Sequence, residues 1–455
     1  MADQIRGRIL SQSNPDLNAP MKNTSDTSTA TNSRREFLRS TTLAAASGLA
    51  ISSHIAQAAE EKKPPVRIAV MGLNGRGKGL LNGFCAFPEV EVAYLCDPDS
   101  KTIPEALKVV AGKGKPVPKV VTDFREALAD KQVTALVCAA PDHWHALATV
   151  WSCQAGKDVY VEKPVSHNIR EGQTMVAAAR KFQRVVQAGT QRRSASDLIE
   201  AVKLIREGKL GDVKMVRTWI TSERPQIGKL QPSAPPENLD FNLWAGPGPG
   251  DVYKSNLVHY HWHWRWDYGT GECGNNGIHA MDVARWGLGV EYPDVVTCGG
   301  GKYFFDDDQE TPDTQLATFD FPNACLQWEH RTWTKRGIDG QTYGVEFYGT
   351  EATLLVSSKG WRMFKDEKEI QKHDGSDMES AHIKNFLDCL VSREKPNGDI
   401  EIAHRSTQLC HLANIAWRTR STVKFDGVKG EIIDNPAAAA LMGRTYRKGF
   451  ELPVV

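Results

Sequence analysis

From residue 66 onward, short apolar runs alternate with segments whose apolar residues recur at helical spacing. Strands are predicted at 66–71, 90–96, 119–121, 135–139, 158–161 and 184–188. Helices are predicted between them, at 78–87, 103–111, 124–129, 146–155 and 171–181. Strands that alternate with helices form a parallel, doubly wound sheet. Residues 64–188 are therefore expected to form an α/β domain.

Beyond residue 188 the pattern changes to longer strands in which apolar and polar residues alternate. Such strands are predicted at 214–220, 314–321, 324–331, 342–348 and 352–356, and a late packing helix at 378–393. Alternation of this kind is typical of an antiparallel sheet with one covered face. A proline-rich stretch from Pro225 to Gly250 is predicted to be a surface flap. Residues 189–455 are expected to be an α+β domain with a large, mainly antiparallel open sheet.

Residues 1–63 differ from the rest of the chain. The first 32 are polar, as expected of a disordered segment. Ser33-Arg34-Arg35-Glu36-Phe37-Leu38-Arg39 then precedes a mild apolar run at 43–51 and a small-residue sequence at 56–58. This order resembles a twin-arginine signal peptide with cleavage near Ala58, which predicts export to the periplasm; an amphipathic helix is the alternative. A charged, proline-containing linker at 60–65 follows.

Composition narrows the functional classes. The 455 residues carry 56 Lys+Arg against 55 Asp+Glu, so neither a nucleic acid nor an anionic membrane is an expected partner. No run of about 18 strongly apolar residues exists, so no membrane span is expected in the mature form. The nine cysteines are scattered and contain no C-x-x-C pair, which favours buried free thiols over a disulfide frame or a zinc site.

A glycine-rich loop follows the first predicted strand and opens a helix. In Gly72-Leu73-Asn74-Gly75-Arg76-Gly77, backbone N–H groups at the helix start can bind a pyrophosphate. Asn74 replaces the second glycine of G-x-G-x-x-G, but asparagine tolerates positive φ and Gly75 leaves room beside it.

Asp97 ends the second strand, 20 residues beyond Gly77, where a carboxylate can hold ribose hydroxyls. The same carboxylate would repel a 2′-phosphate. The pattern therefore predicts a Rossmann domain that binds NAD in preference to NADP, with Arg76 the one feature in favour of NADP.

Three further motifs follow later strands: Pro141-Asp142-His143-Trp144-His145, Glu162-Lys163-Pro164 and Gly189-Thr190-Gln191. With the glycine loop, they make residues 64–455 resemble the glucose–fructose oxidoreductase/inositol dehydrogenase/MocA (Gfo/Idh/MocA) family. Exported members are similar also in the twin-arginine signal, in the sequence at 244–247 and in that at 264–271. The resemblance implies a small-molecule carbohydrate substrate and a homo-oligomer assembled through the C-terminal sheet. It also implies that the cofactor pocket is shaped by Pro141, His145, Glu162, Lys163 and Gln191.

The resemblance places Lys163 beside the nicotinamide and the reacting carbinol. A lysine at the carboxyl end of a parallel strand faces the ligand crevice, and a neighbouring positive ring lowers its pKa toward neutral acid/base chemistry. The family's Asp-x-x-x-His motif corresponds to 275–279, so His279 is kept while Asn275 replaces the aspartate. His279 is the predicted acid/base, with Lys163 as the alternative base and a buried structural histidine as the remaining interpretation. Asp282 is predicted either to anchor the site or to pack.

The segment His259-Tyr260-His261-Trp262-His263-Trp264-Arg265-Trp266 concentrates histidine and tryptophan. If it is extended, its alternation places the three histidines and Arg265 on one side and the aromatic rings on the other. A metal site is chemically possible, but no Cys, Asp or Glu lies between the histidines to complete a shell, and no metal is expected. A substrate wall is favoured over plain packing. Arg265, Tyr268 and Asn275 are the substrate residues expected beside Lys163, His279 and Asp282.

The leading functional hypothesis is an NAD-dependent oxidoreductase that acts by hydride transfer on a secondary hydroxyl of a sugar, cyclitol or glycoside. Two alternatives come from the resemblance. One is an exported, NAD-retaining glycoside hydrolase that works through transient oxidation and elimination. The other is a non-catalytic sugar-binding protein, which is disfavoured because Lys163 and His279 are both present.

Overall fold

The computed structural model describes residues 65–455. The predicted disordered segment, the twin-arginine signal with its cleavage site, and most of the linker lie outside these residues. Among the helices of residues 65–455, none is long and apolar enough to cross a membrane. All nine cysteines lie in this range as free thiols, and seven of them are buried.

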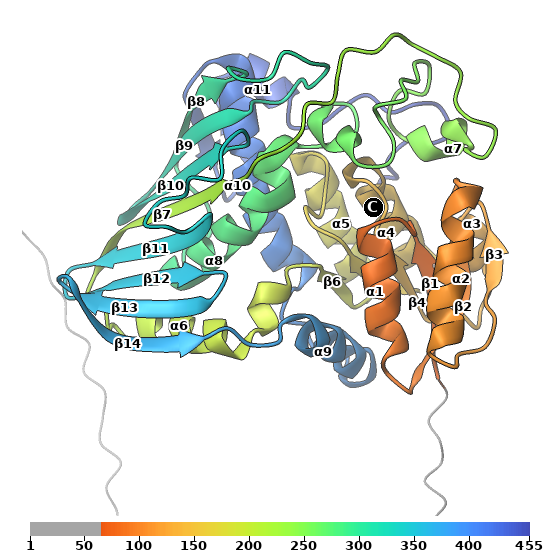
Figure 1. Cartoon of the computed structure of the whole chain (residues 1–455), viewed down its shortest axis with the longest axis horizontal. Helices are drawn as coiled ribbons and strands as arrows, with labels where there is room; N and C mark the ends of the chain where they lie inside the picture. The colour runs from red at the N-terminus through yellow and green to blue at the C-terminus, as the bar shows by residue number, and fades with distance from the viewer. Residues whose placement is uncertain (1–64) are drawn as a thin grey trace, which may run out of the picture. The chain divides into compact units, whose positions relative to one another are not determined.

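The first part of the chain contains a six-stranded parallel sheet (Figure 1). Its strands are β1 (Val66–Met71), β2 (Val90–Cys96), β3 (Lys119–Val121), β4 (Ala135–Cys138), β5 (Asp158–Val161) and β6 (Val186–Ala188). The helices between them are α1 (Arg76–Cys85), η1 (Ser100–Thr102), α2 (Ile103–Gly112), α3 (Arg125–Ala129), α4 (Asp142–Gln154) and α5 (Ile169–Lys181). The strand order β3-β2-β1-β4-β5-β6 brings β1 beside β4, where the winding reverses. The predicted α/β domain is confirmed.

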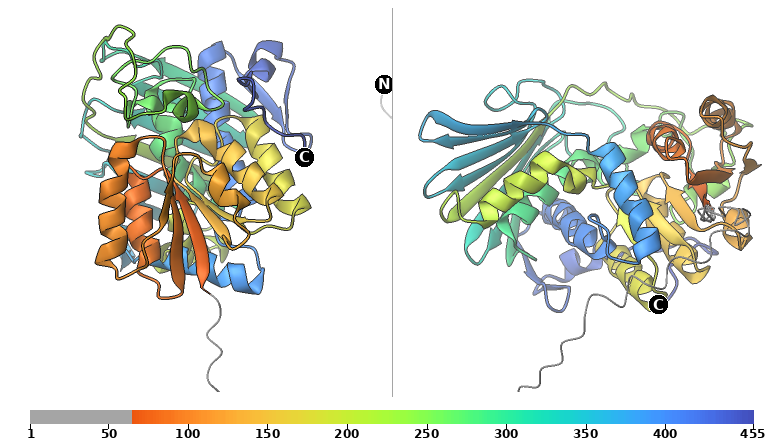
Figure 2. Two further views of the ribbon diagram at one scale, coloured as in Figure 1. Left: turned by 90° about the vertical axis from the view of Figure 1, so that its right-hand side faces the viewer. Right: turned by 90° about the horizontal axis from the view of Figure 1, so that it is seen from below.

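Strand β1 explains why the apolar runs of this domain are nearly continuous. Ile68 and Val70 pack in one apolar cluster with Leu80 of α1, whereas Ala69 and Met71 belong to the cluster on the opposite face. Helices cover both faces of the sheet, as the left view of Figure 2 shows. Both sides of each central strand must therefore be apolar, which removes the alternation expected of a half-exposed strand.

The second part of the chain is built around a ten-stranded sheet. Its strands are β7 (Val213–Thr221), β8 (Val295–Gly301), β9 (Thr314–Phe321), β10 (Ala324–Arg331), β11 (Tyr343–Gly349), β12 (Thr353–Ser357), β13 (Gly360–Lys365), β14 (Lys368–Asp374), β15 (Val423–Asp426) and β16 (Glu431–Ile433). The helices are η2 (Gln191–Ser194), α6 (Ser196–Arg206), α7 (Phe241–Ala245), η3 (His261–Trp264), the π-helical turn η4 (Cys273–Gly277), α8 (Ile278–Leu288), α9 (Glu379–Ser392), α10 (Ile400–Thr419) and α11 (Pro436–Ala440).

The order of this sheet is β14-β13-β12-β11-β7-β10-β9-β8-β15-β16. Strands β7 and β10 run parallel, and their pairing is the exception within a sheet whose other paired strands are antiparallel. The expected α+β domain with a large, mainly antiparallel sheet is confirmed.

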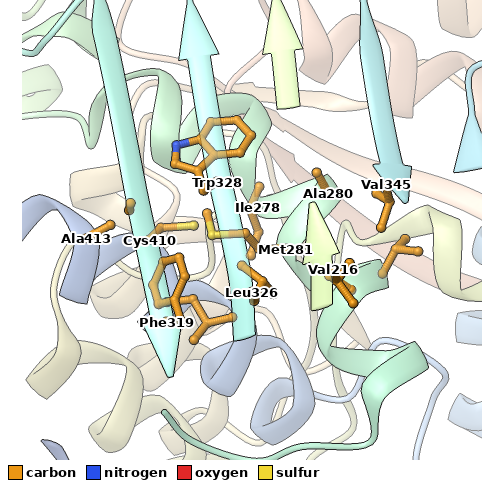
Figure 3. Packing of buried hydrophobic residues seen from close by; sticks show 14 of the residues in the cluster. Val216, Ile278, Ala280, Met281, Phe319, Leu326, Trp328, Val345, Cys410 and Ala413 are labelled. Atoms are coloured by element: carbon orange, nitrogen blue, oxygen red, sulfur yellow. The ribbon is translucent and has the colours of Figure 1, made fainter. Parts of the chain in front are cut away.

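The core of the second domain lies between this sheet and helices α8 and α10 (Figure 3). Trp328 of β10 is fully buried there, with Ile278 and Met281 of α8 and Cys410 of α10 in the same cluster. A Cβ atom on Gly277 would stand 2.8 Å from the Trp328 ring, so the residue before α8 must be small for the helix to pack this closely. This contact fixes where α8 and the preceding turn η4 begin.

Helices from late in the sequence complete the first domain. Phe386 of α9 belongs to the apolar cluster of Ile68, and Ala403 of α10 belongs to the cluster of Ala69 on the other face. The described residues accordingly fall in one compact unit. The change of pattern at residue 188 marks the passage from one sheet to the other. Helices that follow the second sheet's first strands in the sequence nevertheless pack on the first sheet.

Replacing Trp328 by alanine is expected to lower the free energy of unfolding by about 3–5 kcal/mol, because the side chain is fully buried and leaves a cavity. Denaturant unfolding of both proteins measures the loss. Val428 is 99% exposed, and the Val428→Ala control is expected to change stability by less than about 0.5 kcal/mol. Equal small losses in both variants would contradict the placement of Trp328 in the core.

Candidate cofactor and substrate site

A cavity of about 270 Å³ lies at the carboxyl ends of strands β1, β2, β4 and β5. Its first-domain walls are formed by Gly72–Arg76, Cys96–Pro98, Ala139–Asp142, Trp144, His145, Glu162 and Lys163, with Thr122 and Phe124 nearby. Its other wall consists of Leu243, Trp244, His259, Tyr260, Trp262, His263 and Asn275. The cavity thus occupies the crevice where β1 and β4 diverge, which is the ligand position of doubly wound sheets.

The glycine loop is shaped for close approach of an anion. Gly72 has φ +81°, and a Cβ atom on it would stand 2.7 Å from the Ala139 carbonyl oxygen. A Cβ atom on Gly77 would stand 1.8 Å from the Gly72 carbonyl oxygen, so α1 packs directly on the loop. Helix α1 has no side-chain cap at its N-terminus and no acidic residue in its first turn. Its free N–H groups and positive dipole end fit the pyrophosphate of a dinucleotide.

The left-handed residues of this loop are Gly72 and Gly75, whose φ is +47°, and Asn74 is not left-handed. The tolerance of asparagine for positive φ is therefore not used here. Gly77 contributes through its contact with Gly72 and does not line the cavity.

Asp97 joins the glycine loop to the end of β2. Its carboxylate accepts hydrogen bonds from the backbone N–H of Leu73 (2.7 Å) and of Asp99 (2.9 Å), and the side chain lines the cavity. Burial raises the pKa of Asp97, and these backbone donors offset part of that shift. Each carboxylate oxygen thus keeps acceptor capacity beyond these two backbone donors.

Arg76 connects three parts of the chain. Its Nε donates to Glu162 (2.7 Å), and its two terminal nitrogens donate to Glu379 of α9 (3.1 and 2.9 Å). Burial alone would raise the pKa of Glu162, but the charges of Arg76 and Lys163 hold it below its usual range. All three nitrogens of the guanidinium thus donate to carboxylates, although the Arg76 side chain stays partly exposed.

Lys163 is held against the turn η4. Its Nζ donates to the backbone oxygen of Asn275 (2.7 Å) and lies 3.3 Å from the Asn275 side-chain oxygen. Burial lowers the pKa of Lys163, while the carboxylates of Glu162, Asp142 and Glu272 act in the opposite direction. The structure therefore brings together Lys163 and Asn275, which are 112 residues apart in the sequence.

His279 lies one helical turn after Asn275, but it does not line the cavity. Burial, with the positive charges of Lys163 and Arg192, holds its pKa well below the usual value. Its Nδ1 is buried and has no hydrogen-bond partner among the described residues. The imidazole is consequently neutral at physiological pH, and the charge of Lys163 acts on it.

Asp282, Arg265, Tyr268 and Gln191 lie outside the cavity wall. Asp282 is fully buried in a two-pronged ion pair with Arg193 and also accepts from Ser406. Arg265 pairs with Asp308 and Glu310, and the Tyr268 hydroxyl donates to the Pro249 carbonyl. Of the two interpretations offered for Asp282, the packing role agrees with this geometry. Pro141 and His145 do line the cavity, as expected.

The histidine and tryptophan segment at 259–266 is not extended, contrary to the conditional prediction. Residues His261–Trp264 form the short helix η3, in which Trp262 and Trp264 turn inward. His259 Nε2 contacts Asp99 at 2.7 Å, whereas the ring of His263 stacks on Trp262 at 3.6 Å. The histidines thus point to different partners. Within residues 65–455, no three His, Cys, Asp or Glu side chains converge as a metal site.

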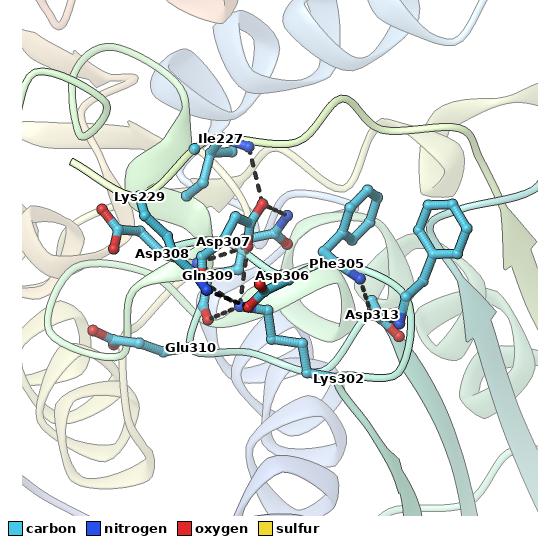
Figure 4. A network of polar contacts seen from close by, with 12 residues as sticks. Ile227, Lys229, Lys302, Phe305, Asp306, Asp307, Asp308, Gln309, Glu310 and Asp313 are labelled. Carbon is cyan, nitrogen blue, oxygen red and sulfur yellow. Dashed lines mark hydrogen bonds and ion pairs between the residues drawn. The ribbon is translucent and has the colours of Figure 1, made fainter.

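The proline-rich flap forms part of the cavity wall, through Leu243 and Trp244 of α7. It lies over the carboxyl ends of the parallel strands (green in Figure 1). The loop between β8 and β9 anchors it: Asp307 accepts from the Ile227 backbone N–H (2.9 Å) and pairs with Lys302 (3.0 Å), as Figure 4 shows. The flap is therefore a fixed wall that belongs to the second domain.

Comparison with family models identifies the chain. A model described as "Oxidoreductase family, NAD-binding Rossmann fold" matches residues 66–190, a "GFO/IDH/MocA C-terminal domain" matches 198–355, and an "Oxidoreductase family, C-terminal alpha/beta domain" matches 357–452. The chain belongs to the Gfo/Idh/MocA family. Its first domain matches the NAD-binding Rossmann model of that family.

Solved structures share the Gfo/Idh/MocA fold. An aldose-aldose oxidoreductase from Caulobacter crescentus, complexed with glycerol, has a TM-score of 0.63 at 18% identity and covers 79% of this chain and 100% of its own. The WlbA dehydrogenase from Bordetella pertussis, in complex with NADH and UDP-GlcNAcA, has a TM-score of 0.61 at 19% identity over 80% of this chain and 99% of its own. A levoglucosan dehydrogenase in complex with NADH scores 0.62 at 14% identity over 79% of this chain and 99% of its own. At these identities the likeness establishes the fold.

Curated relatives of this Gfo/Idh/MocA chain include glycosyl hydrolase family 109 proteins. One from Shewanella pealeana is 26% identical over 200 residues, 40% of this chain and 44% of the relative. One from Shewanella sp. strain W3-18-1 is 24% identical over 156 residues, 33% of this chain and 34% of the relative. The chain thus matches less than half the length of these relatives.

Several residues of this Gfo/Idh/MocA site were not predicted from the sequence as parts of it. Glu272 is fully buried between Arg224 (3.1 Å) and the amide of Asn276 (2.6 Å), and its charge faces Lys163. Trp244 lines the cavity and accepts at its carbonyl from the Trp144 indole (2.9 Å). The Pro-Asp-His-Trp-His motif contains Trp144 and so drew attention to this region of the sequence. Nothing in the sequence pointed to Glu272 except that it is close to Asn275.

Replacing Arg76 by methionine leaves Glu162 buried without its guanidinium partner. The free energy of unfolding is expected to fall by about 3 kcal/mol near pH 7, the lower end for breaking a buried pair because the Arg76 side chain is 36% exposed. The pair holds the Glu162 pKa below its unfolded value, so its stabilisation is present above about pH 4.3 and is lost as the pH falls. The destabilisation caused by Arg76→Met should therefore be smaller near about pH 3 than near pH 7. Urea unfolding of both proteins at the two pH values measures the difference.

The exposed pair of Lys108 and Glu105, with side chains 73% and 58% exposed, supplies the control. Lys108→Met is expected to change stability by less than about 1 kcal/mol at either pH. A loss in Arg76→Met that is equally large in acid would show that packing of the arginine, and not its charge, is what matters.

Proposed function

We propose that this protein is an NAD-dependent oxidoreductase that acts on a secondary hydroxyl of a sugar, cyclitol or glycoside. The observation that carries the proposal is a half-buried lysine, Lys163, in the same cavity wall as the glycine loop and Asp97. One cavity therefore offers a pyrophosphate cradle, a carboxylate for a ribose and a group that can carry a proton. The solved relatives named as aldose-aldose oxidoreductase and levoglucosan dehydrogenase support a carbohydrate as substrate.

The residues present fit a nicotinamide dinucleotide. The N-terminus of α1 binds the pyrophosphate, and Asp97 accepts hydrogen bonds from ribose hydroxyls. When bound, the cofactor supplies the hydride acceptor or donor. Lys163 in its neutral form accepts the proton of the substrate hydroxyl, and the two oxygens of Asn275 orient the amine toward it. Because burial lowers the pKa of Lys163, a larger share of the amine is neutral at physiological pH.

Two observations favour NAD over NADP. Asp97 presents a carboxylate at the ribose position, and Arg76 is engaged by Glu162 and Glu379, so it is not available for a 2′-phosphate. His279 stays a candidate for the proton-carrying group, but Lys163 lines the cavity and His279 does not.

The glycosyl hydrolase family 109 relatives favour a second candidate, a glycosidase that retains NAD and oxidises its substrate transiently. Native mass spectrometry of the purified protein tests for retained NAD. With substrates of both kinds, appearance of net NADH from a free sugar supports the oxidoreductase. Aglycone release from a glycoside without net NADH supports the hydrolase, and neither result with tight sugar binding supports a non-catalytic role. Export by the twin-arginine route and assembly through the larger sheet stay predictions from the sequence.

Asp97→Ala is expected to weaken NAD binding at least about 10-fold, because a charge-assisted hydrogen bond to the ribose is lost. The ratio of NADP to NAD affinity should rise at the same time, since the carboxylate that repels a 2′-phosphate is gone. Isothermal titration calorimetry with both cofactors measures these values. Glu105→Ala, on the exposed surface of α2, is the control and should leave both affinities unchanged. An unchanged ratio in Asp97→Ala would contradict the ribose assignment.

Lys163→Met is expected to keep NAD bound and to lose at least about 10²-fold in kcat, the low end for removing a positioned acid/base. The wild-type rate of alcohol oxidation should rise with pH through the lowered pKa of Lys163, because the neutral amine is the active form. The variant should lack this rise. Rates of hydride transfer followed across the pH range provide the test, with Lys181→Met on α5 as the control. A normal pH profile in Lys163→Met would assign the proton to His279 instead.

A further inference from the structure

Asp142 is a buried carboxyl group in the cavity wall that the proposed mechanism does not use. It opens helix α4, its side chain is 1% exposed, and its Oδ2 accepts a hydrogen bond from the Thr270 hydroxyl at 2.7 Å. Within residues 65–455, no lysine or arginine nitrogen lies within 4.0 Å of this carboxylate. A carboxyl group that is buried without an ion-pair partner has no role as a structural salt bridge.

The charges that face Asp142 come from three elements. Lys163, at the end of β5, favours the ionised carboxylate, and Glu171 of α5 opposes it. On its own helix, His143 and His145 are buried and contact backbone carbonyl oxygens. Glu272, the residue just before η4, acts with its charge on Lys163. Burial outweighs the stabilising contacts and raises the pKa of Asp142 to about 7. Near neutral pH the group is therefore present both with and without its proton.

The hydroxyl that binds Asp142 is fixed from the side of η4. A Cβ atom on Gly274 would stand 1.9 Å from Thr270 Oγ1, so the turn that carries Asn275 packs directly on this hydroxyl. The Thr270 carbonyl in turn accepts from the amide of Asn414 on α10 (2.8 Å). The same turn thus contacts Lys163 through Asn275 and, through Gly274, the threonine whose hydroxyl binds Asp142.

Behind Thr270 lies a small void that is separate from the cofactor cavity. This void of about 30 Å³ borders Thr270, His411 and Asn414, which is room for a water molecule with several polar neighbours. It shares His167 and Arg418 with a wider groove at the surface, which the chain after α11 and the loop at 247–251 enclose. Thr270 therefore contacts Asp142 and also borders this void, whose lining is partly shared with the surface groove.

We propose that Asp142 is the second proton-carrying group of this site, which passes the substrate's proton from Lys163 to solvent through Thr270 and the void behind it. This inference rests on the proposed oxidoreductase function. In alcohol oxidation, the substrate O–H bond breaks and an N–H bond forms on Lys163, while the C–H electron pair leaves as hydride to the nicotinamide. Because the Lys163 nitrogen and the Asp142 carboxylate lie more than 4.0 Å apart, a water molecule in the cavity that both residues line would bridge them. The Lys163 N–H bond breaks as an O–H bond forms on this water, and the water in turn gives a proton to Asp142, which releases one through Thr270 to water in the void. A substrate that closes the cavity mouth would leave this route open.

The first experiment needs no substrate. Infrared spectra of the protein are recorded across the pH range for wild type and Asp142→Asn, which keeps the shape and an acceptor for Thr270. A carbonyl band of a protonated carboxyl group should be present in mild acid, disappear with a midpoint near neutral pH, and be absent from Asp142→Asn. A spectrum without this titration, or the same titration in the variant, would overturn the proposal.

The second measurement concerns the electrostatic link to Lys163. Its reactivity toward a small acylating reagent, followed by mass spectrometry against pH, reports the share of neutral amine. Asp142→Asn removes a negative charge that favours the ammonium form, so the pH midpoint of Lys163 labelling should fall. An unchanged midpoint would show that Asp142 and Lys163 are not electrostatically coupled and would contradict the relay.

The third measurement separates failure of the relay from failure of the function. Asp142→Asn should lower kcat at least about 10-fold while the NAD dissociation constant stays within about 2-fold. Thr270→Val removes a hydrogen bond to the charged Asp142 carboxylate and should therefore raise the apparent pKa on the acidic side of the pH–rate profile. Thr270→Ser keeps the hydroxyl and should behave as wild type. If the wild type is active and both Asp142→Asn and Thr270→Val keep its kcat and its pH profile, the relay is overturned but the proposed function is not. Absence of hydride transfer in the wild type overturns the proposed function, and the relay with it.

Discussion

The bridge made by Arg76 is the interaction on which the rest of the site depends. One guanidinium group ties the first turn of α1 to Glu162 at the end of β5 and to Glu379 on α9. Burying Glu162 is unfavourable unless its charge is balanced, and Arg76 is the residue that balances it from the glycine-loop side. The loop that would hold the cofactor and the residue next to Lys163 therefore cannot move independently. A helix from late in the sequence takes part in this balance, which links the second domain to the cofactor site.

The charges around Lys163 form a second layer of the same arrangement. Glu162, Asp142 and Glu272 act on the ammonium group together, while burial favours the neutral amine. Glu272 is itself paired with Arg224, so part of its charge is compensated. The pKa of Lys163 is thus lowered by burial and raised by carboxylates from both domains, and no single partner fixes it. Such a group can change its protonation state without leaving an unpaired charge in the interior.

The sequence was sufficient for the features that are local. Continuous apolar strands predicted the parallel sheet because both faces of β1 are covered, and the glycine loop predicted a bound anion because its geometry lies within six residues. Helix α10 was not predicted, since His404, Thr407, His411 and Asn414 are polar and yet buried, which hides its apolar face. The ion pair of Asp282 with Arg193, 89 residues away, and the bond of Asp142 to Thr270, 128 residues away, exist only in the folded chain. No pattern of spacing could have shown which of these acidic residues faces the cavity.

The flap shows how chains that share this fold can differ in substrate. Its carbonyl at Trp244 accepts from both the Trp144 indole and the His143 ring, so the flap is attached to the same helix α4 that Asp142 opens. Asp307 and Asp308 attach the opposite end of the flap to the second domain. The wall that a substrate would meet is therefore built from residues that bind one another and not from the sheets that relatives share. Two chains with the same fold and the same lysine can then differ in substrate through this wall alone, because its shape depends on contacts specific to each sequence.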